Sequence, residues 1–174
     1  GWDGLNATGE IRPTAEKSPT KITEHIGCLI AKGVEAFPFL DFSPLSLVNS
    51  TGGHIHLEVP EDMSKSLAMR RAKTLSALVA PIIASENQVS AEYRRNGGSY
   101  GKIDDIRIER HFNWPSGVDG LTAEIRFPTP EWLITPHITE ATLALFAVIW
   151  HAVLTDATFR KEINEVTFRN QKES

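Results

Sequence analysis

The sequence predicts an α+β fold in which a mainly antiparallel sheet packs with one face against helices. Short segments with alternating polar and apolar residues indicate strands, and longer runs with apolar residues at helical spacing indicate helices. These elements follow one another as strand, helix, strand, helix, two strands and helix. Because 174 residues is the length of one ordinary domain, we expect residues 1–174 to form a single domain.

The first predicted strand is Glu10-Ile11-Arg12, which follows a turn and places its acid and its arginine on one face. Ser18 and Pro19 are typical of a helix start, and apolar residues at helical spacing extend this helix over residues 19–35. Cys28 falls within its apolar run, so we expect that side chain in the core.

Residues 54–59 alternate as a strand should, with His54, His56 and Glu58 on one face and apolar residues on the other. The apolar face is expected to join the core, which leaves the histidines on a polar working face. Gly52 and Gly53 precede the histidines and are expected to leave room for a bulky anion. An ordinary edge strand with polar residues directed outward would give the same pattern.

The remaining elements follow the same periodicities. A second helix carries apolar residues from 63 to 82, and residues 107–110 and 121–127 alternate as strands. Thr135-Pro136 begins a last, strongly apolar helix. Residues 160–174 are rich in charged residues and are predicted to form a C-terminal tail.

Composition restricts the class of partner. A net charge of -4 and a pI of about 5.9 do not fit a protein whose main partner is nucleic acid or an anionic membrane, since such partners select basic surfaces. No run reaches the roughly 18 to 20 consecutive apolar residues of a membrane span. One cysteine permits no intrachain disulfide. We therefore expect a cytoplasmic protein with small-molecule partners.

The polar faces of the predicted strands suggest metal and phosphate chemistry. Glu124-Ile125-Arg126 repeats the Glu-Ile-Arg pattern of residues 10–12. Glu10, His54 and Glu124 on one sheet face, with Asp3 near its rim, would suit Mg²⁺, and neighbouring arginines would bind phosphate oxygens. Each Glu-Ile-Arg taken alone is better explained as a structural or solvated ion pair.

Two other functions fit parts of the pattern. A metal hydrolase could be built on His54 and His56, although cysteine pairs and an H-E-x-x-H helix are absent from the sequence. A non-catalytic binding module could keep the same sheet and expose a surface for a partner. The sequence has neither a phosphate-binding P-loop nor a recognisable setting for a serine or cysteine nucleophile.

Taken together, the motifs resemble those of the glutamine-synthetase-like carboxylate–amine ligases, and most closely the phage-type amidoligases (COOH-NH2 ligases). The similarity covers roughly residues 1–134 and rests on the order and spacing of several short motifs. These are Asp3-Gly4 with Gly9-Glu10-Ile11-Arg12, then Gly53-His54-Ile55-His56, then Tyr93-Arg94-Arg95 to Tyr100-Gly101, and Ala123-Glu124-Ile125-Arg126-Phe127-Pro128 before Glu131-Trp132-Leu133.

The resemblance implies a catalytic domain with a curved antiparallel sheet, helices behind it, and possible assembly into a homo-oligomer. The alternative to a catalytic domain is a non-catalytic binding or phage assembly module on a degenerate ligase fold. The resemblance implies that a small carboxylate is phosphorylated by ATP in the presence of Mg²⁺ or Mn²⁺. An amine then displaces the phosphate to form an amide. By position, the implied metal ligands are Asp3, Glu10, His54 and Glu124. The implied nucleotide-binding residues are Arg12, His56 and Arg95, and the implied catalytic arginines are Arg107 and Arg126.

The sequence departs from the family pattern at its start. The family's sheet begins with an E-x-E strand whose glutamates complete the metal sites, and Gly1-Trp2-Asp3 follows the point where that strand belongs. We therefore expect the chain to be a fragment of a longer protein.

Overall fold

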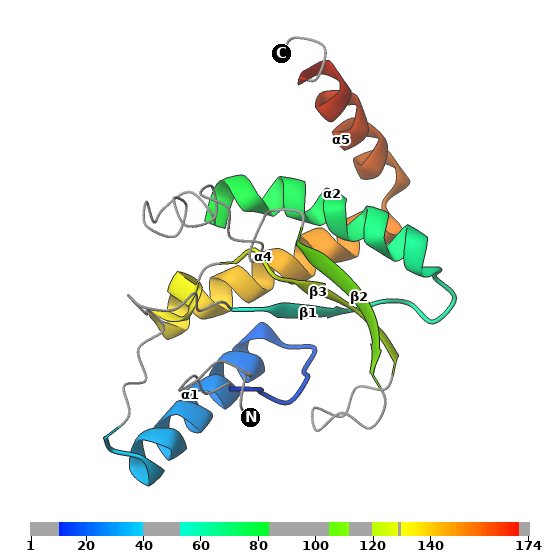
Figure 1. Ribbon diagram of the computed structural model, residues 1–174. Coiled ribbons are helices and arrows are strands. Elements are labelled where there is room, and N and C mark those ends of the chain that lie inside the picture. Colours follow the sequence, from blue (N-terminus) through cyan, green and yellow to red (C-terminus); the bar gives the residue numbers. More distant parts are fainter. Residues whose placement is uncertain (1–10, 40–52, 84–104, 112–119, 129, 171–174) are drawn as a thin grey trace.

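The computed structural model describes residues 11–39, 53–83, 105–111, 120–128 and 130–170, which form helices packed against a three-stranded sheet (Figure 1). The elements in chain order are α1 (Pro19–Ala36), β1 (Ile55–Glu58), α2 (Lys65–Ile83), β2 (Ile106–His111), β3 (Gly120–Ile125), the 3-10 helix η1 (Pro130–Leu133), α4 (Pro136–Thr155) and α5 (Ala157–Asn170). The predicted α+β class is confirmed.

Helix α1 begins where the sequence predicts. The Ser18 hydroxyl accepts a hydrogen bond from the backbone N–H of Lys21, and Pro19 occupies the first helical turn, where its missing N–H costs nothing. The strand predicted just before it is wrong for its described part, because Ile11 and Arg12 are exposed and have no regular secondary structure. Pro13 follows directly and cannot donate to a strand ladder.

The prediction that Cys28 is buried is also wrong, since this thiol is exposed. Helix α1 contacts α4, where the Thr20 hydroxyl donates a hydrogen bond to Glu140 Oε1. No residue of α1 is fully buried, so the helix lies against the edge of the core and leaves its other side exposed.

Strand β3 lies in the middle of the sheet, with β1 on one side and β2 on the other, and both pairs are antiparallel. The predicted antiparallel sheet is therefore confirmed. Ile125 pairs with Ile55 of β1 and with Ile106 of β2, so all three strands direct apolar side chains to the same face.

The core lies between this apolar face and helices α2 and α4. Ile55 and Ile125 from the sheet are buried together with Leu75 of α2. Phe127, just after β3, packs against Phe146 of α4 with ring centroids 6.3 Å apart. Packing on this face leaves the opposite face of the three strands to carry the polar side chains.

Two tryptophans hold the two ends of β1. Trp132 Nε1 donates a hydrogen bond to the carbonyl of Gly53 at 3.3 Å, and Trp150 Nε1 donates to the carbonyl of Glu58 at 2.8 Å. The Thr139 hydroxyl donates to the carbonyl of Trp132 at 2.9 Å and so fixes the first tryptophan. The histidine-bearing strand is thereby attached to η1 and α4.

The space beside Gly53 is filled by protein, which corrects the expectation that it receives an anion. A Cβ added to Gly53 would overlap Trp132 Nε1 and would lie 2.7 Å from the Cε2 of the same indole. Atoms cannot approach so closely, so only glycine permits the indole to reach the backbone here.

The predicted last helix is confirmed, and a further helix follows it. Thr135 caps α4 by accepting a hydrogen bond from the backbone of Ile138. Residues 160–170 of the predicted charged tail lie in α5, which extends away from the sheet (Figure 1). Asp156 Oδ1 accepts a hydrogen bond from the backbone N–H of Phe159 and so caps this helix. This capping residue was available in the sequence but was not used to predict a helix in so charged a segment.

Among the described helices, α4 is long and apolar enough to cross a membrane by length and composition alone. Phe146, Trp150 and Val153 of this helix are buried in the protein. Helices α1 and α2 both contact it. Packing within the fold thus accounts for the apolar composition of this side of α4.

Replacing Gly53 by alanine tests the contact with Trp132. The added methyl group would displace the indole and break its hydrogen bond, so we expect Gly53→Ala to lower the free energy of unfolding by about 2 to 3 kcal/mol. Urea titration followed by circular dichroism measures the change.

Gly27→Ala is the matched control, because a Cβ at this position in α1 would meet nothing within 4 Å. The control should be unchanged or more stable by up to about 1 kcal/mol, since alanine favours helix. Equal stabilities of the two variants would contradict the proposed close contact at Gly53.

Candidate functional site

The strand register assembles a row of polar side chains across the sheet. Glu124 of β3 is the Cα partner of His56 on β1 and of Arg107 on β2. Because β3 is the central strand, Glu124 is covered from both sides and only 6% exposed. A carboxylate so deeply placed requires partners, and the row supplies them.

His54 completes a convergent group with His56 and Glu124. His54 lies two residues before His56 and therefore on the same face, and its Nδ1 is 2.9 Å from Glu124 Oε1. One possible ligand atom from each of the three residues lies within 4.8 Å of the others. That spacing suits a single cation, because metal ligands bind at about 2.0 to 2.6 Å.

Glu124 is a carboxylate stabilised in its ionised form. Burial raises its pKa, but the hydrogen bond from His54 and the positive charges of His54, His56 and Arg126 together outweigh burial and lower the pKa below its ordinary value. The side chain therefore offers a negative charge to a bound cation at neutral pH.

Arg126 lies beside this group between two carboxylates. Its Nε is 3.4 Å from Glu124 Oε1, and its Nη1 is 3.6 Å from Asp105 Oδ1. The backbone N–H of Arg126 also donates to the carbonyl of Asp105 at 3.2 Å, which continues the pairing of β2 with β3. The guanidinium belongs to a residue that is only 8% exposed, and it is thus fixed next to the candidate metal ligands.

The sequence reasoning missed Asp105. Its position two residues before the predicted strand at 107–110 was the available signal, since an antiparallel partner of Arg126 had to lie near that strand's start. Without the register, no spacing in the sequence connects Asp105 with Arg126.

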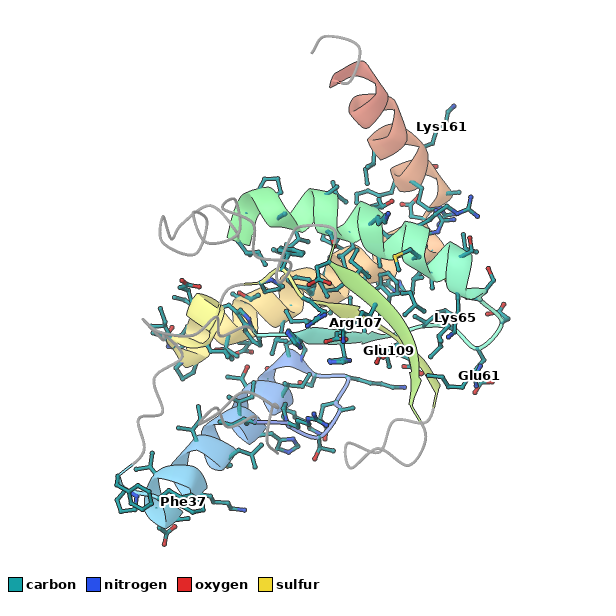
Figure 2. The ribbon with its side chains drawn as sticks, viewed as in Figure 1. Phe37, Glu61, Lys65, Arg107, Glu109 and Lys161 are labelled. Atoms are coloured by element: carbon teal, nitrogen blue, oxygen red, sulfur yellow. The ribbon has the colours of Figure 1, made fainter. Side chains whose placement is uncertain are left out.

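Arg107 stands on the same face as Glu124 and is exposed, as Figure 2 shows for this labelled side chain of β2. Within the described part of the chain, no carboxylate forms an ion pair with it. Its guanidinium therefore remains available to an anion that approaches the sheet from solvent.

None of the contacts described above involves the other predicted site residues. Arg12 lies on the irregular segment before α1 rather than on a strand. Asp3, Glu10 and Arg95 lie outside the described residues. Their assignments stay predictions.

Comparison with known protein families adds a decisive observation. Residues 3–173 match the family described as Phage phiEco32-like COOH.NH2 ligase-type 2. The chain belongs to this family. The resemblance inferred from the short motifs is confirmed, and the COOH.NH2 ligase family extends it over nearly the whole chain. No curated protein and no solved structure matches the chain.

The residues that the sheet brings together fit a divalent metal ion. The ionised carboxylate of Glu124 is a donor suited to Mg²⁺ and Mn²⁺, and the imidazoles of His54 and His56 are donors suited to transition metals such as Zn²⁺. The neighbouring guanidinium of Arg126 would bind an anionic substrate group adjacent to the ion.

Removing the charge of Glu124 should weaken metal binding. We expect Glu124→Gln to reduce the affinity for Mn²⁺ by at least about 10- to 100-fold, because a neutral amide replaces the only ionised ligand of the group. Isothermal titration calorimetry with MnCl₂ measures the loss.

Glu61→Gln, an exposed residue after β1, removes the same charge away from the site and should keep the wild-type affinity. Thermal unfolding of both variants controls for folding. Equal Mn²⁺ affinity of wild type and Glu124→Gln would show that Glu124 is not a metal ligand.

Proposed function

We propose that this protein is an ATP- and Mg²⁺-dependent ligase that joins a small carboxylate to an amine through an acyl phosphate. The observation that carries the proposal is the convergence of His54, His56 and Glu124 within 4.8 Å, beside the buried guanidinium of Arg126. Membership of a COOH.NH2 ligase family supports the same reaction class.

The reaction needs its negative charges neutralised. A substrate carboxylate oxygen attacks the γ-phosphorus of ATP, ADP leaves, and an acyl phosphate forms. The amine then attacks the acyl carbon, phosphate leaves, and loss of a proton from nitrogen gives the amide. A bound Mg²⁺ would supply Lewis-acid stabilisation of the phosphoryl oxygens.

The chain's own residues would position these groups. Arg126 is held by Glu124 and Asp105 and would bind the substrate carboxylate or the transferred phosphoryl group. His56 is exposed on the same face; one of its ring nitrogens would bind the metal ion and the other would donate to a nucleotide phosphate. Arg107, beside Glu124, would bind a second phosphate oxygen.

Further ligands are proposed from the family resemblance alone. Asp3 and Glu10 would add carboxylates to the metal site, and Arg12 and Arg95 would add positive charge around the nucleotide. Magnesium prefers oxygen donors and usually keeps several waters, so these additional carboxylates would favour it over softer metals.

The ligase proposal is tested by supplying ATP, MgCl₂, hydroxylamine as the amine, and a pool of amino acids and small dicarboxylates. We expect hydroxamate and ADP in equal amounts, and EDTA should abolish both. Arg126→Lys should lower turnover by at least about 100-fold, because lysine lacks the two-pronged geometry of a guanidinium.

Arg70→Lys, on the exposed side of α2, is the matched control and should retain turnover. Hydroxamate formation without ADP, or full activity of Arg126→Lys, would contradict the proposed role of the site.

A metal hydrolase is the second candidate, because two histidines and one glutamate are also the donor set of catalytic zinc in some hydrolases. Such an enzyme would hold zinc stoichiometrically and act without nucleotide. Elemental analysis of the purified protein separates the two functions. The ligase proposal expects no stoichiometric zinc, whereas one zinc per chain would favour the hydrolase.

A further inference from the structure

A second polar row crosses the sheet next to the candidate site. Thr122 of β3 is the Cα partner of Glu58 on β1 and of Glu109 on β2. The alternation of strand side chains places this row on the same face as Glu124, two residues farther along each strand. Figure 2 shows Glu109 and Arg107 together on β2.

The Thr122 hydroxyl lacks a hydrogen bond. Its residue is 3% exposed, and its Oγ1 is buried with no partner in the described structure. A buried hydroxyl without a partner is costly, so the position is suited to a group that a ligand supplies.

The glutamates on either side are ready to accept hydrogen bonds. Glu58 and Glu109 are exposed, and neither forms an ion pair with another described residue. Ionised carboxylates only accept hydrogen bonds, so Glu58, Thr122 and Glu109 together would recognise a ligand group rich in donors.

A ligand group rich in donors could be the attacking amine or the ribose of the nucleotide. The distance from Thr122 to the row of His56, Glu124 and Arg107 decides between them. Two residues along a strand span about 7 Å. An attacking amine must come within about 3 to 3.5 Å of the acyl carbon, which a nitrogen held over Thr122 would not reach. The ribose of a nucleotide, by contrast, is separated from the terminal phosphate by several bonds. With the phosphate on the first row, the ribose can therefore lie over the second row about 7 Å away.

We propose that Glu58, Thr122 and Glu109 bind the ribose hydroxyls of ATP. This inference rests on the proposed function, in which the phosphates lie on the His56 and Arg107 row. Carboxylates accept hydrogen bonds from ribose in other nucleotide sites as well. The carbonyl of Glu58 is held by Trp150, so the row is fixed before the nucleotide binds.

Binding of Mg-ATP and Mg-2′-deoxyATP, measured by calorimetry, tests the proposal. Wild type should bind ATP about 10- to 100-fold more tightly than the deoxynucleotide that lacks the contacted hydroxyl. This nucleotide is 2′-deoxyATP if the glutamates contact the 2′-hydroxyl and 3′-deoxyATP if they contact the 3′-hydroxyl. In Glu58→Gln/Glu109→Gln and in Thr122→Val, affinity for ATP should fall toward that for the deoxynucleotides. Glu61→Gln is the matched control and should keep the preference.

The possible outcomes are distinct. Equal wild-type affinity for ATP and both deoxynucleotides, or an unchanged preference in the double variant, would overturn ribose recognition while leaving the ligase proposal standing. Absence of ATP binding to wild type would overturn both. Loss of a stoichiometric Mn²⁺ ion in the double variant would identify the row as a cation site and would also overturn the proposal.

Discussion

The candidate site depends on the two indole hydrogen bonds that hold β1. Trp132 binds the carbonyl of Gly53 and Trp150 binds the carbonyl of Glu58, one on each side of the two histidines. With both ends fixed, the antiparallel pairing places His56 directly opposite Glu124. The geometry of the polar face therefore follows from contacts made by η1 and α4, which carry none of the candidate metal ligands.

The second constraint is the burial of charge at Glu124. A lone carboxylate at the centre of the sheet would lose its hydration without compensation, and burial alone would favour its protonated form. His54 at 2.9 Å and Arg126 at 3.4 Å reverse that preference and keep it ionised. The same neighbours would hold an anionic substrate and a cation side by side, which links the stability of the charge to the proposed ligation of a carboxylate and an amine.

The period of two in the strand segments allowed the sequence to predict which side chains share the polar face, including His54, His56 and Glu124. The strand register was not predictable, because neither the pairing of β1 with β3 nor that of β2 with β3 follows from local periodicity. The Asp105 contact was missed because it depends on the register of β2 against β3. The role of Gly53 was missed for a related reason, since its neighbour Trp132 is distant in sequence. Local periodicity also does not predict which side of α1 contacts α4. For this reason the exposure of Cys28 was not predicted.

Binding of one divalent cation between His54, His56 and Glu124 underlies the proposed chemistry. An anomalous difference map from crystals of this protein soaked with MnCl₂ and a non-hydrolysable ATP analogue would locate the ion. We expect a manganese peak about 2.0 to 2.4 Å from a ligand atom of each of these three residues, with a phosphate oxygen also bound to the ion. A manganese peak elsewhere, with the His54 to Glu124 hydrogen bond intact, would contradict this cation site.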